Sequence, residues 1–166
     1  MDDSTPTTVT VRQADLADPA DQNSVLALTS AYAQDPMGCG KTLDDETRRR
    51  LIPGLRQHPT TVIFLAEIAG EPVGIATCFV GFSTFAAKPL LNIHDLAVSK
   101  QFRGQGIGRQ LLGAVEQLAR DRGYCAVTLE VEERNELAHR TYLMNGYVQD
   151  HHGEGQGLTL YLKKSL

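Results

Sequence analysis

The sequence predicts a mixed α/β domain in which a central twisted sheet carries helices on its faces, in the order β-α-α-β-β-β-α-β-α-β-β. Two observations lead to this prediction. Short runs of alternating apolar and polar residues interleave with longer runs at helical spacing, and Gly, Pro, Asn and Asp separate them. No internal repeat or linker-like segment divides the 166 residues. We therefore expect a flexible stretch over 1–8 and a single domain over 9–166.

The first third of the chain predicts one strand and two helices. Residues 9–15 alternate apolar and polar side chains, which indicates a strand. The Asp-Pro pair at 18–19 is typical of a helix start, and the helical pattern continues to about Gln34. The segment "LDDETRRRLIPGL" suggests a second, shorter helix, which we expect the Pro-Gly pair at 53–54 to end.

The middle of the chain predicts three strands. The segment "TVIFLAEIAGEPVGIATCFVGF" has two β-rich runs around an Ala-Gly-Glu-Pro turn, which is typical of a hairpin. Residues 90–98 predict a further strand, apolar except for Asn92, His94 and Asp95.

The last third predicts two helices and three strands. Apolar residues recur at helical spacing over 107–119, and "GYCAVTLEV" then alternates as a strand. A helix is expected from Asn135 until Gly146 ends it. Residues 147–150 and 158–162 can supply two final strands around a glycine-rich turn.

Composition excludes several classes of protein. With 42% hydrophobic and 22% charged residues, the chain is typical of an ordinary soluble globular protein. Its formal net charge of −4 argues against a nucleic-acid surface, which is usually basic. It has no run of about 18 apolar residues, so no membrane span is expected. The N-terminus has no signal-peptide pattern and the three cysteines are widely spaced, so we expect a cytoplasmic protein.

A glycine-rich loop predicts a site for phosphate. Gly104, Gly106 and Gly108 lie between a strand end and a helix start, where residues without Cβ let backbone N–H groups approach a ligand. The unpaired N–H groups and the dipole of the helix favour an anion there. Arg103 and Arg109 flank the loop and could add charge-assisted contacts. A glycine-rich turn that only reverses the chain is the alternative.

Two signatures carry a resemblance to a known family. "RGQGIG" fits R-x-x-G-x-G, and "NELAHRTYLMNGY" fits N-x-x-A-x-x-x-Y-x-x-x-G-[FY] at the expected distance and in the expected order. The chain resembles the GNAT superfamily of acyl-CoA-dependent N-acyltransferases over nearly its whole domain. The stretch before the glycine loop is most similar to the diamine and polyamine acetyltransferase branch. It departs from that branch at His94, where the branch usually carries glutamate.

This resemblance implies acetyl-CoA as co-substrate and no metal. The pyrophosphate would lie on the backbone of 104–109, the pantetheine arm would pair with the strand at 96–98, and Asn135 would meet that arm from the far side. A homodimer through the last strands is compatible with this fold. The expected cofactor-binding residues are Leu96, Ala97, Val98, Arg103, Gly104, Gln105, Gly106, Ile107, Gly108, Arg109, Asn135 and Ala138.

The resemblance and the residue chemistry give two candidate catalytic side chains. The family implies that Tyr142 protonates the departing thiolate; a tyrosine packed in the core is the alternative. An imidazole titrates near neutral pH, so His94 is the candidate base, with a structural hydrogen bond as the alternative. Asp95 is expected to face the other side of an ideal strand, unless a bulge re-aims it. The N–H of Leu96 or Ala97 could polarise the thioester carbonyl.

The acceptor site has weaker candidates. Asp35 could hold a cationic amine, although a solvated helix face is the favoured interpretation. Phe82 could line the pocket, with core packing as an equal alternative, and Glu154 could reach the acceptor site from its loop. The histidine pair in "HHGEGQG" has no third ligand at useful spacing, so no metal is expected.

We therefore predict an acetyl-CoA-dependent N-acetyltransferase that acetylates the primary amine of a small molecule by direct transfer in a ternary complex. A protein N-terminus or lysine is the alternative acceptor. A non-catalytic acyl-CoA-binding sensor is the second alternative.

Overall fold

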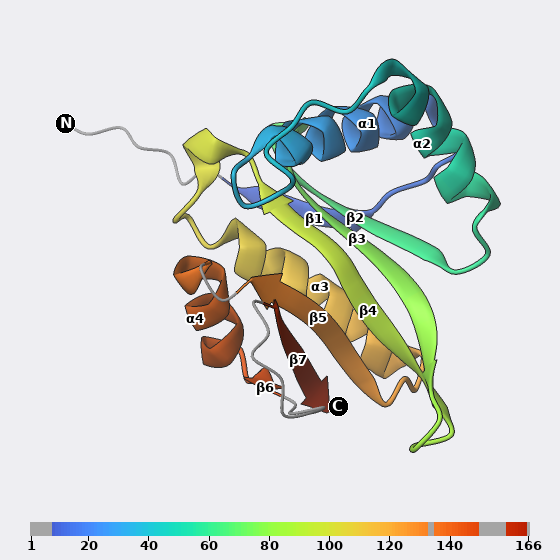
Figure 1. Ribbon diagram of the computed structural model, residues 1–166, viewed down its shortest axis with the longest axis vertical. Helices are drawn as coiled ribbons and strands as arrows, with labels where there is room; N and C mark the ends of the chain where they lie inside the picture. The colour runs from blue at the N-terminus through green and yellow to red at the C-terminus, as the bar shows by residue number, and fades with distance from the viewer. Residues whose placement is uncertain (1–7, 133–134, 150–158, 166) are drawn as a thin grey trace.

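The computed structural model describes residues 8–132, 135–149 and 159–165 of the chain. The predicted fold class and element order are confirmed (Figure 1). The stretch at 1–7, most of the expected flexible N-terminus, lies outside the described residues. The elements are β1 (Val9–Gln13), α1 (Pro19–Gln34), α2 (Asp45–Gln57), β2 (Thr61–Ile68), β3 (Glu71–Ser83), β4 (Lys88–Val98), the 3₁₀ turn η1 (Lys100–Phe102), α3 (Ile107–Asp121), β5 (Ala126–Glu132), α4 (Glu136–Met144), β6 (Val148–Gln149) and β7 (Thr159–Ser165).

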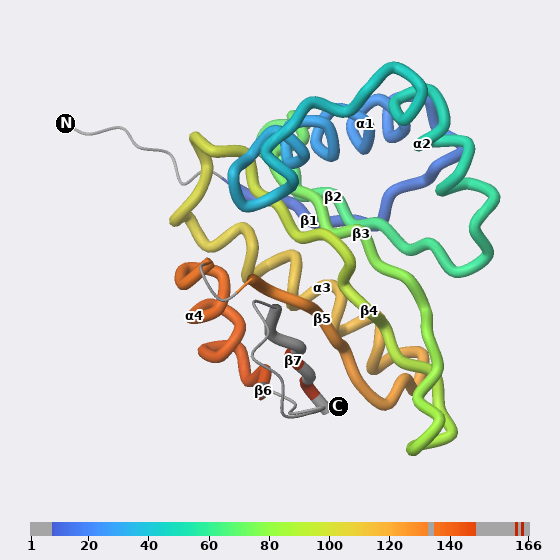
Figure 2. The backbone as a smooth tube through the Cα atoms, viewed as in Figure 1, coloured from blue at the N-terminus to red at the C-terminus, as the bar shows by residue number. Residues whose placement is uncertain are grey.

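The described strands form one mixed sheet in the order β1-β2-β3-β4-β5-β7-β6. Neighbouring strands are antiparallel except for β4 and β5, which are parallel. The Ala-Gly turn between β2 and β3 has positive φ at both Ala69 and Gly70, as a tight hairpin requires. Figure 2 shows the crossover from β4 through α3 to β5, which places the glycine loop at one end of the parallel pair.

Each face of the sheet has its own apolar core. Alternate residues of β2 divide between the two faces: Val62 and Phe64 pack on the side of α3 and α4, whereas Ile63 and Leu65 pack on the side of α1 and α2. This is the consequence of the period of two in a strand that is buried on both faces. The helices thus cover both faces of the sheet, as the alternation predicted (Figure 1).

The expectation that the Pro-Gly pair at 53–54 ends the second helix is wrong, because α2 continues to Gln57. Pro53 removes the one backbone hydrogen bond that its missing N–H would have made. Beyond it, the helix is held by the His58 N–H, which donates to the Gly54 carbonyl at 2.9 Å. Ile52 and Leu55 also pack into the core between α2 and the sheet. Core packing therefore outweighs the local preference of proline.

Two ion-pair clusters fix the helices that border the central strands. Asp21 at the start of α1 is buried and accepts two hydrogen bonds from Arg12 of β1, at 2.6 and 2.8 Å. On the other face, the Lys164 ammonium of β7 contacts Glu116 of α3 at 2.6 Å and the Asn145 carbonyl after α4 at 2.7 Å. Both α1 and α4 are thereby anchored to strands of the sheet.

Candidate active site

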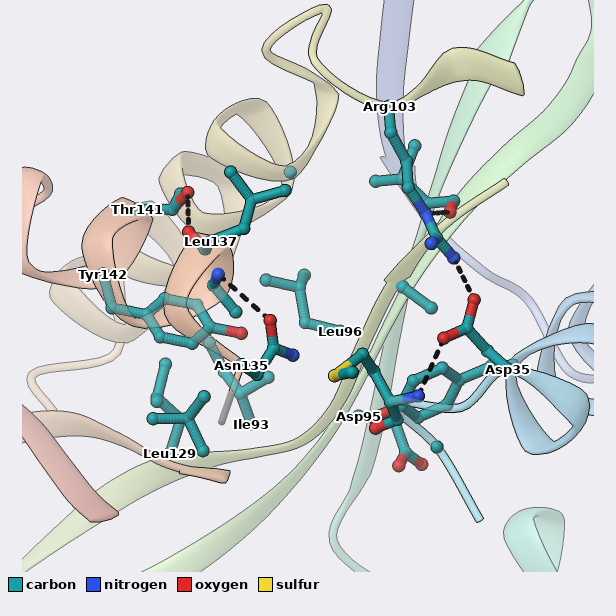
Figure 3. A pocket seen from close by; sticks show the side chains of 18 of the residues that line it. Asp35, Ile93, Asp95, Leu96, Arg103, Leu129, Asn135, Leu137, Thr141 and Tyr142 are labelled. Atoms are coloured by element: carbon teal, nitrogen blue, oxygen red, sulfur yellow. Dashed lines mark hydrogen bonds and ion pairs between the residues drawn. The ribbon is translucent and has the colours of Figure 1, made fainter. Parts of the chain in front are cut away.

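A large cavity opens where β4 and β5 separate. The two parallel strands pair at only three positions, the last being Ile93 with Leu129. Asn92 joins them just before this point, because its Nδ2 donates to Thr128 Oγ1 at 3.1 Å. Beyond it the strands diverge (Figure 1). A cavity of about 1360 Å³ lies between them, and Figure 3 shows the side chains that line it. The strand ends, the glycine loop, α4 and the segment after α1 all line this cavity.

The diverging part of β4 presents backbone groups to the cavity. The Ser99 N–H donates to the Val73 carbonyl of β3 at 2.8 Å, so the Val98 carbonyl of the same peptide points away from β3, where it accepts from Arg103 Nε at 2.9 Å. Backbone groups alternate along a strand, so those of Leu96 also point into the gap. Ala97 pairs with Ile75, and its backbone groups point toward β3. Of the three strand residues predicted to bind pantetheine, Leu96 and Val98 therefore have suitably directed groups and Ala97 does not.

The glycine loop forms an open end of the cavity. Gly104 and Gly106 have φ values of 79° and 78°, in the left-handed region that favours glycine. A Cβ at either position would have no heavy atom within 4 Å, so this backbone can be approached closely. Gly106 precedes α3 and has no side chain to cap the N–H groups of the first turn. These N–H groups are thus open to a ligand, and the anion site expected from the sequence stays a prediction.

Tyr142 reaches the cavity from the opposite side. Its ring packs in the core beside Tyr147, at 6.0 Å between ring centroids, and the residue is only 7% exposed. Figure 3 shows its hydroxyl pointing toward the space between α4 and β4. Burial raises the pKa of Tyr142 well above its ordinary value, so the hydroxyl keeps its proton at neutral pH. Core packing and a place in the cavity were alternatives for Tyr142 in the sequence analysis. The structure combines them, because the ring packs in the core and the residue also lines the cavity.

Asn135 determines where α4 begins. Its side-chain oxygen accepts a hydrogen bond from the Ala138 N–H at 3.2 Å, which caps the helix. Both residues line the cavity below Tyr142. All predicted cofactor-binding residues line the cavity except Gln105, whose side chain is exposed on the outside of the loop.

A β-bulge changes the direction of the two polar residues of β4. Thr77 of β3 pairs with Asp95 and the next residue, Cys78, pairs with Ile93, so His94 is an extra residue. Asp95 therefore does not face away from His94 as in an ideal strand: the bulge named as the exception in the sequence analysis is present, and it places two consecutive side chains on the same side. Both line the cavity on the side of α1.

The environments of these two residues differ. His94 is exposed, and its ring lies against the edge of Phe79 at 5.7 Å between centroids. Asp95 is half-buried, and this burial raises its pKa although His94 opposes the effect. Tyr32 at the end of α1 is close by: burial and then the Asp95 carboxylate raise its pKa. The strand therefore carries two candidate proton-transfer groups instead of the one that was predicted.

The acceptor side of the cavity is acidic. Glu130 and Glu132 of β5 line it together with Asp95. The sequence reading missed these two glutamates, although a signal was present: Val127, Leu129 and Val131 point to the α3 side, so the residues between them point to the other side.

The three predicted acceptor residues do not come together. The prediction that Phe82 lines the acceptor pocket is wrong. Phe82 pairs with Pro89 near the start of β4, far from the gap, and is 62% exposed. Its hairpin extends past the start of β5, so it lies outside the cavity. Glu154 lies outside the described residues. Asp35 does line the cavity, and its Oδ2 accepts a hydrogen bond from Arg103 Nη2 at 2.6 Å.

Among the residues that the structure describes, no three His, Cys, Asp or Glu side chains are grouped to hold a metal ion. The histidines of "HHGEGQG" are outside that part of the chain. None of the described helices combines the length and apolar character that crossing a membrane would require.

The conformation of the glycine loop gives a test with a matched control. Gly106 and Gly113 both have open space where a Cβ would project, but only Gly106 has positive φ. We expect Gly106→Ala to lower the free energy of unfolding by about 1–2 kcal/mol, because L-residues are strained there. Gly113→Ala, inside α3, should raise it by about 0.5–1 kcal/mol. Urea unfolding of both variants measures this difference, and equal effects would contradict the loop geometry.

Known proteins resemble the chain in sequence and in fold. YhfO, an uncharacterized N-acetyltransferase of Bacillus subtilis, is 33% identical over 94 residues, which cover 57% of this chain and 63% of that protein. The aminoalkylphosphonate N-acetyltransferase of Salmonella typhimurium is 38% identical over 87 residues, covering 52% and 56%. The match thus spans less than two thirds of either relative.

The fold and the family agree. The PaiA N-acetyltransferase of Thermoplasma acidophilum, solved in complex with coenzyme A, superimposes with a TM-score of 0.72 over 96% of this chain and 99% of its own. Sequence identity is 13%, so this likeness concerns the fold. The model of the acetyltransferase (GNAT) family matches residues 25–147. This match covers most of the described domain, and the chain belongs to the GNAT acetyltransferase family.

Proposed function

We propose that this protein is an acetyl-CoA-dependent N-acetyltransferase that acetylates the primary amine of a small molecule by direct transfer in a ternary complex. The observation that carries the proposal is the convergence on one cavity of unpaired strand backbone, an anion-binding loop and a buried tyrosine hydroxyl. Family membership supports the reaction type.

The residues present fit coenzyme A. Its pantetheine arm contains amide groups, which can pair with the Leu96 carbonyl and the Val98 N–H as an added strand would. Its pyrophosphate suits the uncapped N–H groups at the start of α3, beside the open positions of Gly104 and Gly106. When bound, acetyl-CoA supplies the acetyl group as an activated thioester.

Tyr142 is proposed as the acid that protonates the departing thiolate. The high pKa that follows from its burial keeps its proton available at neutral pH. The N–H of Leu96, directed into the gap, is proposed as the donor to the thioester carbonyl oxygen. Ala97 is not proposed for this role, because its N–H points toward β3.

His94 is proposed as the base that removes the proton of the amine, through water because its side chain is exposed. The bulge brings Asp95 to the same side, where it can attract the cationic amine together with Glu130. An acidic lining of this kind favours a cationic acceptor. One relative is named for an aminoalkylphosphonate, which supports a small-molecule acceptor, and the diamine resemblance remains a prediction.

The proposal is tested by mixing the protein with acetyl-CoA and separate amines: polyamines, amino acids, aminoalkylphosphonates, aminoglycosides and lysine peptides. Release of free thiol that depends on a small amine is the expected result. Release with peptides alone would favour a protein acceptor. Binding of acetyl-CoA with no release across the panel would favour the sensor and contradict the proposal.

Replacing the acid should separate catalysis from binding. We expect Tyr142→Phe to lower kcat by about 100-fold or more, because the thiolate must then leave without a positioned proton donor. The KM for acetyl-CoA should change less than about threefold. The matched control is Tyr147→Phe, since that hydroxyl is buried outside the cavity. Unchanged turnover in Tyr142→Phe would remove the acid role.

The base can be tested through pH. We expect His94→Ala to lower kcat/KM about 100-fold at pH 7, where the amine is almost entirely protonated. The loss should shrink toward pH 10, because the amine then loses its proton to solvent. His58→Ala is the matched control, since His58 contacts the same Phe79 ring at 4.8 Å but does not line the cavity. A loss that is constant with pH would contradict the role of His94.

A further inference from the structure

We propose that Asp35 is a positioning residue for Arg103, and that this ion pair links the acceptor-side wall of the cavity to the coenzyme loop. The inference rests on the proposed function, because it assumes that the loop receives the pyrophosphate of coenzyme A. It assigns Asp35 to cofactor binding instead of to direct contact with the acceptor amine.

The ion pair holds one edge of the Arg103 guanidinium. Nε donates to the Val98 carbonyl at 2.9 Å and Nη2 donates to Asp35 Oδ2 at 2.6 Å (Figure 3). A guanidinium has five N–H donors, so the opposite edge keeps three of them. These three have no partner among the described residues. Arg103 directly precedes Gly104 and lines the same cavity as the glycine loop, so we infer that these donors contact a pyrophosphate bound there.

Asp35 is itself firmly placed. It follows the last residue of α1, and its side chain is only 14% exposed. Its Oδ1 accepts from the Met37 N–H at 2.9 Å, and its backbone carbonyl accepts from the Gly38 N–H at 2.9 Å. The Met37 N–H and then Arg103 hold the pKa of Asp35 below its ordinary range, so it stays ionised near neutral pH. The carboxylate is therefore a fixed anchor for a long, flexible cation.

The same contacts make Asp35 a poor anchor for an acceptor amine. One oxygen is used by the backbone of its own turn, and the other is paired with a guanidinium. Asp95 and Glu130 also line the cavity, and neither forms an ion pair with an arginine or lysine in the described part of the chain, so they are better suited to attract a cation. Asp35 thus acts on the cofactor side, through Arg103.

The pair also connects two walls of the site. The turn that Asp35 organises continues through residues 37–39, which line the acceptor side of the cavity. Arg103 belongs to the loop on the cofactor side. An arginine that is already fixed before the ligand binds loses little conformational entropy on binding, so the ligand binds more tightly. Loss of the pair should consequently weaken coenzyme A binding, and the deficit should require Arg103.

The test is a double-mutant cycle on the dissociation constant of coenzyme A, measured by titration calorimetry. Asp35→Asn keeps the oxygen that accepts from Met37 but removes the charge that holds Arg103. We expect it to weaken binding about tenfold, a typical effect of losing a charge-assisted contact. In an Arg103→Gln background, the same Asp35→Asn change should alter the dissociation constant less than about twofold. With acetyl-CoA, the effect should appear in KM and not in kcat.

A matched control removes another carboxylate from an arginine. Glu67→Gln takes one of two acids from Arg12, on β1 and β2 far from the cavity, and should leave coenzyme A binding unchanged. Equal affinity of wild type and Asp35→Asn, or additive losses in the double variant, would overturn the inference. So would an effect confined to the KM of the amine. Wild-type protein that does not bind coenzyme A would instead refute the proposed function, and with it this extension.

Discussion

The separation of β4 and β5 after the Ile93–Leu129 pair is the constraint on which the site depends. In a continuous parallel sheet the backbone groups of Leu96 and Val98 would be used by the neighbouring strand. Here β5 remains paired with β7 as far as Glu132, and β4 remains paired with β3 as far as Val98. Each strand is thus held by its outer neighbour, so the two can diverge without losing their own support. Unpaired backbone groups are costly when buried, and a ligand with amide groups is one way to satisfy them.

The bulge at His94 is a second constraint, acting on the other side of the same strand. It breaks the alternation that would have directed His94 and Asp95 to opposite faces. The α3 face keeps the apolar residues Leu96 and Val98, while the α1 face receives two adjacent polar side chains next to Tyr32. The backbone edge of β4 is thereby available to the proposed cofactor, while the acidic side chains on its α1 face are available to the proposed acceptor amine. The glycine loop and Tyr142 complete the cavity at its two ends.

The sequence was informative where local chemistry decides the structure. Periodicity predicted the elements because each strand and helix has one or two buried faces, and the positive φ of Gly104 and Gly106 explains why these glycines stand out. Prediction from the sequence failed where tertiary contacts override local preference. At Pro53, for example, the helix continues because Ile52 packs into the core. The bulge at His94 could be named only as an alternative, because the pairing register with β3 decides whether it forms.

Contacts between residues that are far apart in the sequence could not be predicted either. Asp35 and Arg103 are 68 positions apart and were predicted for different parts of the site, yet they contact each other. Phe82 was a candidate for lining the acceptor pocket, but hairpin register pairs it with Pro89 at the start of β4, far from the gap. Glu130 and Glu132 could have been found, since the apolar alternation of β5 implies their direction.

The most direct measurement is amide hydrogen exchange at single residues, with and without acetyl-CoA. The N–H groups of Leu96 and Val98 face the gap and that of Ala97 is paired with β3. We expect acetyl-CoA to slow exchange at Leu96, at Val98 and through the loop at 104–109. Ala97 should already exchange slowly without ligand. Binding of acetyl-CoA with no added protection at Leu96 and Val98 would contradict the claim that the diverging strands form its site.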